Sequence, residues 1–198
     1  MFRWNFFPAM FQLLQPSYFL KYLEEIGPFL PEFSVYNAVA AITVCRHYGI
    51  DQEIIRKALK TIRVPGRVEV IDNDRGYLLL IDYAHNAMSL KNILETMRRY
   101  HPRQLWVLFG CGGGRSAARR SEMGRVAGKY ADFTVITSDN PRYEEPERIM
   151  QKIEEGMKET KGQYQMMVDR KEAMRFMLAQ GRSGDILILA GKGHEQYQ

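Results

Sequence analysis

The sequence predicts an α/β fold: a Rossmann-like, mostly parallel sheet with helices on both faces. From residue 67 onwards, short strand-like runs alternate with amphipathic, helix-like runs. The strand-like runs are almost continuously apolar, which is typical of parallel strands buried on both sides. The polar or glycine-rich loops come directly after strands, and open α/β sheets bind ligands at that edge.

Two helices are expected ahead of the sheet. Residues 34–50 carry apolar side chains at helical spacing, and this run ends at Gly49, a common helix stop. Asp51 is then placed to cap a second helix over residues 52–62. The stretch VPGR that follows breaks this helix before the first strand.

Six strands and four further helices are expected in the sheet region. The strands span residues 67–72, 77–83, 105–110, 133–138, 164–168 and 185–191. The helices span residues 89–100, 117–129, 145–159 and 170–180. Each of these helices lies between two strands, which is the connection that parallel neighbours require.

Residues 1–32 are apolar and aromatic, but prolines at positions 8, 16, 28 and 31 interrupt them. No apolar run there approaches the ~20 residues of a membrane span, and there is no small-residue cleavage site of a signal peptide. The aromatic side chains follow neither a helical nor a strand period. We leave this segment unassigned, with a non-native stretch from a misread or frameshifted gene as one interpretation.

Composition narrows the class of function. The chain has 198 residues and a net charge of +5, with Lys and Arg interleaved among acidic residues. This pattern favours small anionic ligands and disfavours a nucleic-acid groove or a membrane partner. Cys45 and Cys111 make no metal-type spacing, so we expect a reducing cytoplasm, without a disulfide framework or a zinc site.

The loop GCGGGRS follows the third strand and precedes a helix. Its glycines allow backbone N–H groups to approach an anion, and Arg115 can bind a carboxylate or a phosphate in a bidentate fork. The loop is not a Walker A motif, because no Gly-Lys-Ser/Thr follows. The alternative is a tight turn that needs glycine for steric reasons alone.

The loop SDNPR follows the fourth strand. Pro141 fixes the backbone before Arg142, and the side chains of Asp139 and Asn140 can hydrogen-bond an ammonium group. With Arg115 in a neighbouring loop, this composition favours an amino-acid site with arginines for carboxylates and acids for ammonium groups. The alternative is an Asx-Pro turn that only caps the next helix.

Two more loops complete the expected rim. GKGHE follows the last strand and offers Glu195 to a substrate amine. His194 is a candidate general base, although a lone loop histidine is more often a hydrogen-bonding support. IDYAHN places Asp82 and His85 at a strand exit, where a carboxylate can hold a ribose hydroxyl or a metal-bound water; a helix cap by Asn86 is the alternative. No Ser-His-Asp set or helical pair of histidine ligands appears, which disfavours hydrolases and metalloenzymes.

Taken together and in this order, FSVYNAVAA, VPGR, DYAHN, GCGG-R, SDNPR and GKGHE-YQ resemble the Mur ligase family. The resemblance runs from Phe33 to Gln198 and is closest to members that add meso-diaminopimelate to UDP-N-acetylmuramoyl-L-Ala-D-Glu in peptidoglycan synthesis. It implies an ATP- and Mg²⁺-dependent amide-forming ligase. ATP phosphorylates the carboxylate of the nucleotide-linked peptide, and the amine of the amino acid attacks the acyl-phosphate.

The resemblance also implies roles for particular residues. Arg142 is similar to the family arginine that holds the distal carboxylate of diaminopimelate, which lysine lacks. No catalytic residue and no metal ligand is assigned within the chain. The implied ATP-binding residues are Asn37, Arg67, Asp82 and His85. The implied diaminopimelate-binding residues are Arg115, Asp139, Asn140, Arg142, Gly191 and Glu195.

The same resemblance predicts the domain organisation. Residues 33–66 correspond to the end of the central ATP-binding domain, as a helical remnant, and residues 67–198 to a truncated C-terminal amino-acid-binding domain. The phosphate loop, the carbamylated lysine that holds Mg²⁺ and the UDP-sugar domain of the family have no counterpart in the sequence. Gly114 and Ala87 replace the Asp and Pro of many relatives. We therefore expect a fragment that is inactive alone, with the missing Mur ligase domains as its partners.

Two alternatives stay open at this point. One is a related Mur-type ligase that adds another amino acid, such as lysine or glutamate. The other is a non-catalytic module that binds an amino acid without phosphate chemistry. A nucleic-acid role is the least favoured, because basic residues do not cluster and no aromatic stacking platform is evident.

Overall fold

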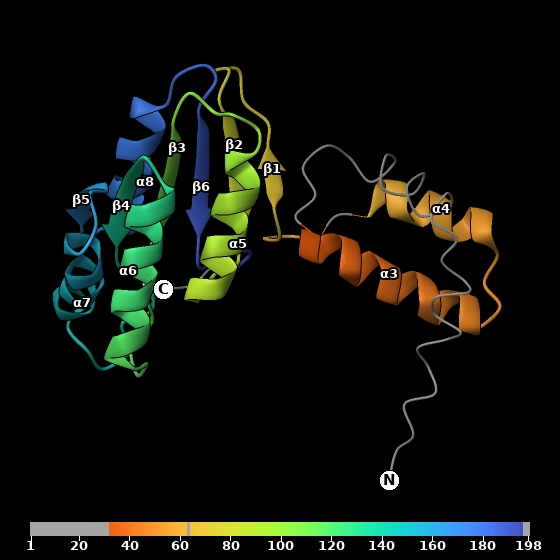
Figure 1. Cartoon of the computed structure of the whole chain (residues 1–198), viewed down its shortest axis with the longest axis horizontal. Helices are drawn as coiled ribbons and strands as arrows, with labels where there is room; N and C mark the ends of the chain where they lie inside the picture. The colour runs from red at the N-terminus through yellow and green to blue at the C-terminus, as the bar shows by residue number, and fades with distance from the viewer. Residues whose placement is uncertain (1–31, 63, 196–198) are drawn as a thin grey trace, which may run out of the picture. The chain divides into compact units, whose positions relative to one another are not determined.

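The computed structural model describes residues 32–62 and 64–195, so the expectations for residues 1–31 lie outside the described part of the chain. The contacts of the chain divide it into two units, Met1–Arg63 and Val64–Gln198, which are described separately. Figure 1 labels the helices and strands of both units. The division falls three residues before the boundary expected from the sequence.

The first unit contains two helices, α3 (Glu32–His47) and α4 (Gln52–Thr61). Both were predicted, and Asp51 caps α4 as expected, since its side chain accepts a hydrogen bond from the backbone N–H of Glu53 at 2.8 Å. Few of the described apolar side chains in this unit are buried; Val39 and Ile55 are among them. Large exposed ones include Tyr36, Val44, Tyr48 and Ile54.

The second unit is built on a six-stranded sheet in the order β1-β2-β6-β3-β4-β5. Strand β1 pairs antiparallel with β2, and the other neighbours pair in parallel. The mostly parallel α/β sheet predicted from the sequence is therefore confirmed. The strands are β1 (Glu69–Ile71), β2 (Leu78–Asp82), β3 (Leu105–Phe109), β4 (Phe133–Thr137), β5 (Gln163–Met167) and β6 (Ile186–Ala190).

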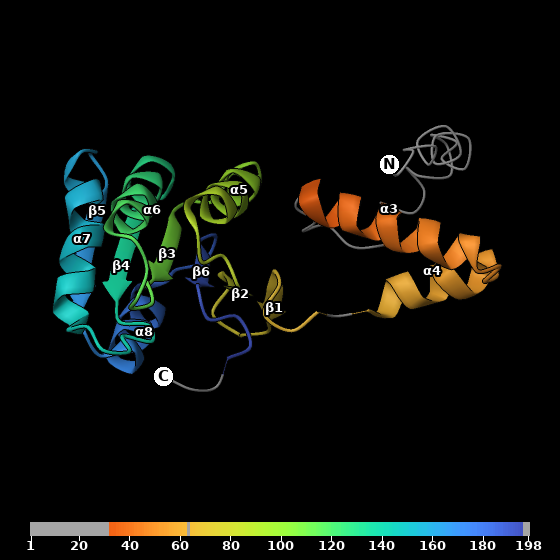
Figure 2. The same cartoon turned by 90° about the horizontal axis from the view of Figure 1, so that it is seen from below.

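Helices cover both faces of this sheet, as predicted (Figure 2). On one face lie α5 (Ala87–Arg98), α6 (Ala117–Tyr130) and α7 (Pro146–Lys158), whose Leu, Ile and Met side chains form the larger core with the inward side chains of the strands. On the other face, α8 (Arg170–Gln180) packs Ala173 and Met177 against Trp106, Leu108 and Val135. Burying such side chains stabilises the sheet by about 1.5–3 kcal/mol each.

The first strand is shorter than the sequence predicted, three residues in place of six. Val68 has a φ of 48°, in the left-handed region, and its N–H donates to the side chain of Asp82 at 2.9 Å. A valine in that conformation cannot extend the strand, because β-branched residues there are sterically strained. The segment before Glu69 therefore lies against the end of β2 as a turn.

Helices α6 and α7 pack closely through glycines. A Cβ atom on Gly156 would lie 1.8 Å from the carbonyl oxygen of Ser121, and one on Gly124 would lie 2.0 Å from that of Ile153. Since the GCGGGRS loop precedes α6 and the SDNPR loop leads into α7, this close packing also brings the two loops together. The described helices include none long and apolar enough to cross a membrane.

Candidate functional site

A pocket opens at the carboxyl edge of the parallel strands, where the loops after β2, β3, β4 and β6 meet. This is the edge at which the sequence predicted a site. Strand β6 lies between β2 and β3, so three loops that are distant in sequence become neighbours. The pocket is lined by Tyr83, His85, Gly110, Cys111, Gly112, Arg115, Arg119, Arg120, Asp139, Asn140, Arg142, Gly191 and Glu195.

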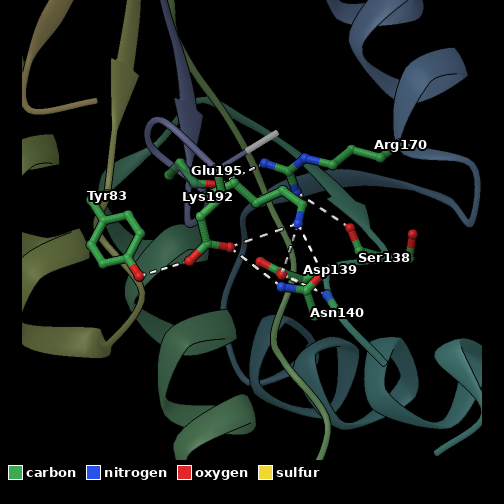
Figure 3. A network of polar contacts seen from close by, with 8 residues as sticks. Tyr83, Ser138, Asp139, Asn140, Arg170, Lys192 and Glu195 are labelled. Atoms are coloured by element: carbon green, nitrogen blue, oxygen red, sulfur yellow. Dashed lines mark hydrogen bonds and ion pairs between the residues drawn. The ribbon is translucent and has the colours of Figure 1, made fainter. Parts of the chain in front are cut away.

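One side of the pocket is an acidic network (Figure 3). The carboxylate of Glu195 accepts a hydrogen bond from the Tyr83 hydroxyl at 2.8 Å and one from the Asn140 amide at 3.3 Å. Lys192 donates to Oδ1 of Asn140 at 3.0 Å and lies 3.6 Å from Oδ1 of Asp139. Each of these side chains thus has its orientation fixed by a neighbour from another loop.

Beside this network, the buried side chain of Arg170 connects the ends of β4 and β6. Its guanidinium donates to the carbonyl oxygens of Ala190 at 2.8 Å and Ser138 at 3.3 Å. Burial lowers the pKa of Arg170, and the nearby charge of Asp139 opposes that shift. The arginine comes from the start of α8 and thus holds together the strand ends that lead directly into the pocket residues Asp139 and Gly191.

The other side of the pocket is basic. Arg115 and Arg142 are exposed and have no hydrogen-bond or ion-pair partner among the described residues. Arg142 has a φ of 57°, an unusual conformation for a residue other than glycine. The Arg119 side chain donates to the carbonyl oxygen of His85. Two free guanidinium groups therefore face the same pocket as the carboxylates of Glu195 and Asp139.

Glu144 connects the two basic loops. Its carboxylate accepts two hydrogen bonds from Arg120, both 2.8 Å, and one from the backbone N–H of Gly114 at 2.6 Å. The hydrogen bonds from Arg120 and Gly114 lower the pKa of Glu144 to about 2. Arg120 is only 4% exposed, and this pairing leaves little of its charge available to a ligand.

The glycines of the GCGGGRS loop have a packing role. The N–H of Gly113 donates to the carbonyl oxygen of Asn140 at 2.9 Å, and a Cβ atom on Gly113 would lie 1.9 Å from the carbonyl oxygen of Pro141. A Cβ atom on Gly112, by contrast, would meet only ordinary contacts. At Gly113, where the GCGGGRS and SDNPR loops are in contact, glycine is therefore required for steric reasons, which was the alternative considered from the sequence.

The ring of Tyr83 is the centre of a second cluster at the edge of the pocket. The guanidinium of Arg67 lies over the ring, 5.2 Å from its centroid. His194 stacks on it at 6.0 Å, and the edge of His85 approaches it at 5.0 Å. The contact found for the exposed His194 ring is thus a ring stack, whereas the sequence led us to expect a hydrogen-bonding support.

Asp82 is the last residue of β2, directly before Tyr83, and does not line the pocket. Its two carboxylate oxygens accept hydrogen bonds from the N–H groups of Val68 and Ala84, at 2.9 Å and 2.8 Å. Burial raises the pKa of Asp82, and these two hydrogen bonds oppose the rise. In this structure the carboxylate fixes the segment before β1, and Asn86 caps α5 by accepting from Ser89, as the alternative from the sequence had it.

The sequence-predicted residues are thus partly brought together. All six of the diaminopimelate set line the pocket, as does His85 from the ATP set. Arg67 contacts the pocket residue Tyr83, and Asp82 precedes Tyr83 at the end of β2. Asn37 belongs to the other unit and is exposed. Sequence reasoning did not select Tyr83, Arg119, Arg120, Cys111, Lys192 or Glu144, although Tyr83 and Lys192 stand inside motifs that it did single out.

Comparison with known proteins assigns the chain to a family. Residues 66–193 match the family model described as Mur ligase, glutamate ligase domain. The chain belongs to the Mur ligase family. It is 47% identical over 176 residues to the UDP-N-acetylmuramoyl-L-alanyl-D-glutamate–2,6-diaminopimelate ligase of Caldanaerobacter subterraneus subsp. tengcongensis, covering 88% of this chain and 36% of the relative.

A second relative extends the similarity towards the N-terminus. The enzyme of the same name from Clostridioides difficile is 40% identical over 192 residues, covering 95% of this chain and 38% of its own length. Since Phe33–Gln198 makes up 166 of the 198 residues, this similarity reaches into the first 32. The chain spans little more than a third of the length of the curated relatives it matches.

Solved structures agree with the fold of this Mur ligase chain. A structure of a UDP-N-acetylmuramoyl-L-alanyl-D-glutamate–2,6-diaminopimelate ligase superimposes with a TM-score of 0.65 and 39% identity, covering 87% of this chain and 35% of that one. E. coli FolC, solved in complex with ADP, has a TM-score of 0.64 at 15% identity, covering 83% and 37%. At that identity the second match shows the shared fold alone.

Proposed function

We propose that residues 64–198 bind the incoming amino acid in a ligase that adds meso-diaminopimelate to UDP-N-acetylmuramoyl-L-Ala-D-Glu. One observation carries this proposal: two unpaired guanidinium groups, Arg115 and Arg142, share a pocket with the carboxylates of Glu195 and Asp139. A ligand that has both carboxylate and ammonium groups matches this arrangement of charges. The similarity to diaminopimelate-adding relatives supports the same ligand.

In this proposal the arginines bind carboxylates of diaminopimelate and the acidic network binds an ammonium group. A guanidinium donates two parallel hydrogen bonds to a carboxylate, which fixes the orientation of the ligand as well as its position. Glu195 is held by Tyr83 and Asn140, so it is in place before the ligand arrives. The other amine of diaminopimelate is then left to attack the activated carboxyl group of the second substrate.

Lysine lacks one carboxylate of diaminopimelate but is otherwise the same molecule. We propose that Arg142 distinguishes the two amino acids, because its guanidinium would have no carboxylate partner when lysine is bound. Selectivity then comes from a hydrogen-bonding group left without a partner, which discriminates better than the shape of an apolar pocket. A related ligase that adds lysine is the alternative that this feature disfavours.

For ATP, we propose that Arg67 and His85, beside the Tyr83 ring, form the part of the nucleotide site that this unit contributes. Within residues 32–62 and 64–195, no group of three or more His, Cys, Asp or Glu side chains is arranged to hold a metal ion. We therefore propose no residue of this part of the chain as a Mg²⁺ ligand. We place residues 33–66 at the end of the ATP-binding domain and the reaction in the cytoplasm.

Isothermal titration of the chain with meso-diaminopimelate and with lysine tests this proposal. We expect diaminopimelate to bind at least roughly tenfold more tightly than lysine, the effect of one hydrogen bond of moderate strength. Arg142→Gln should remove that preference, whereas Arg182→Gln, an exposed arginine at the opposite edge of the sheet, should keep it. Equal binding of the two amino acids by the unchanged chain would rule out the assigned ligand.

A further inference from the structure

One carboxylate holds three segments of the basic side of the pocket together. Glu144 accepts from the backbone of Gly114 in the loop after β3 and from both terminal nitrogens of Arg120 in α6. Glu144 itself belongs to the loop after β4, two residues beyond Arg142. It does not line the pocket. Any effect that it has on a ligand must therefore pass through the residues that it holds.

Arg142 depends on this arrangement. Its left-handed backbone, with φ of 57°, is unfavourable for an arginine and persists only where neighbouring contacts enforce it. The turn is closed by the N–H of Glu144, which donates to the carbonyl oxygen of Pro141 at 3.0 Å. The side chain passes over Gly114, where Nη1 lies 3.3 Å from the position that a Cβ atom would occupy.

We infer that Glu144 and Arg120 are positioning residues that hold Arg142 and the GCGGGRS loop in the geometry that receives the carboxylate of the amino acid. The identity of that ligand rests on the proposed function. The mechanical part of the inference, that Glu144 and Arg120 hold the two loops in place, does not. A guanidinium can bind a carboxylate in bidentate fashion only when its plane and distance are right. Because contacts outside the pocket already orient the Arg142 guanidinium, the loss of side-chain entropy on ordering it does not weaken ligand binding.

The chain contains a matched control for this pair. Arg125 of α6 also binds a glutamate in bidentate fashion: its Nε and Nη2 donate to Glu159 at 2.7 Å and 2.9 Å, and Glu159 directly follows α7. This second pair joins α6 to the end of α7 and does not contact the pocket loops. Glu144→Gln and Glu159→Gln thus remove the same charge from two bidentate pairs, of which the Glu159 pair is the more exposed. Only the first variant should affect the pocket.

Hydrogen exchange tests the mechanical part without any ligand. In Glu144→Gln we expect amide exchange to accelerate in residues 110–116 and 139–145, because Gly114 and the turn at Arg142 lose their anchor. Glu159→Gln should leave those segments unchanged. If both variants exchange like the unchanged chain in these segments, Glu144 does not hold the loops and the inference is wrong.

Titration with the two amino acids then tests the link to binding. Glu144→Gln should weaken meso-diaminopimelate binding roughly tenfold, as expected for a lost hydrogen bond. It should weaken lysine binding less, since lysine does not use Arg142 and its single carboxylate depends on Arg115 alone. An unchanged diaminopimelate-to-lysine ratio in Glu144→Gln, or an equal loss in Glu159→Gln, would overturn the inference.

The outcomes separate this inference from the proposed function. If the unchanged chain binds neither amino acid, the proposed ligand is wrong, and the hydrogen-exchange comparison still decides whether Glu144 holds the loops. If Glu144→Gln does not fold, Arg120→Lys serves as the second variant, because it keeps the charge and removes the bidentate geometry. It is expected to show the same selective loss of diaminopimelate binding, and normal selectivity in that variant would count against the inference.

Discussion

The hydroxyl of Tyr83 donates a 2.8 Å hydrogen bond to the carboxylate of Glu195, across 112 residues of sequence. Tyr83 follows β2 and Glu195 lies in the loop after β6, and these two strands are parallel neighbours. The contact orients Glu195, the residue that we propose receives an ammonium group. It also connects the pocket after β2, β3, β4 and β6 to the cluster of Arg67, His85 and His194 around the tyrosine ring.

Tyr83→Phe removes that hydroxyl and keeps the ring. We expect the free energy of unfolding to fall by about 0.5–1.5 kcal/mol, the net value of one hydrogen bond. Diaminopimelate affinity should fall as well, because Glu195 loses one of the groups that orient it. Urea denaturation and titration calorimetry measure the two effects. An affinity equal to that of the unchanged chain would show that Tyr83 does not orient Glu195.

Gly113→Ala should be far more disruptive than Gly112→Ala in the same loop. The new methyl group at Gly113 would lie 1.9 Å from the carbonyl oxygen of Pro141, whereas at Gly112 the nearest atom is 3.7 Å away. Relieving the first clash means separating two backbones, at a cost of about 1–3 kcal/mol. Thermal unfolding of the two variants gives the comparison, and similar melting temperatures would contradict the close contact of the loops.

Cys111 should be inert to alkylation at pH 8. Burial, with a smaller contribution from the charge of Asp139, raises the pKa of its thiol to about 12, and only the thiolate reacts. In the folded chain, iodoacetamide should label the less buried Cys45 first, as mass spectrometry of peptides would show. The raised pKa also means that folding stability falls as the pH rises from about 9 to 12, because the unfolded thiol ionises first. Rapid labelling of Cys111 in folded protein would contradict this environment.

The Glu144–Arg120 pair should contribute to stability only where Glu144 is ionised. Its pKa is lowered from 4.5 to about 2, so the contribution is present above pH 4.5 and is lost as the pH falls towards 2. Glu144→Gln should remove that part of the acid dependence. Chemical denaturation of both forms between pH 2 and pH 6 provides the test, and parallel stability profiles would show that the pair does not titrate with folding.

Most of the fold could be predicted from the sequence because its signals are local. The apolar runs at residues 105–109, 133–137 and 186–190 are short and bounded by polar or glycine-rich loops, which favours buried strands. Asp51 and Gly49 mark helix ends by residue type alone. The length of β1 was wrong in the prediction, since the conformation of Val68 follows from a hydrogen bond to Asp82 in another strand.

The site was predictable where its residues stand in motifs and not where they depend on strand order. Arg142, Asp139 and Glu195 were selected from their own loops. The roles of Lys192 and Glu144 arise from contacts to residues 52 and 30 positions away. Nothing in the sequence around Glu144 distinguishes it from Glu145 or Glu147, because its partner Arg120 is brought close only by the packing of α6 on α7.

The most direct test of the account is a crystal structure of the chain with meso-diaminopimelate bound. We expect one carboxylate of the ligand within hydrogen-bonding distance of Arg142, another near Arg115 and an ammonium group at Glu195. Glu144 should still be paired with Arg120 beneath Arg142. A ligand bound with its carboxylates away from both arginines, or outside the pocket, would contradict the central claim.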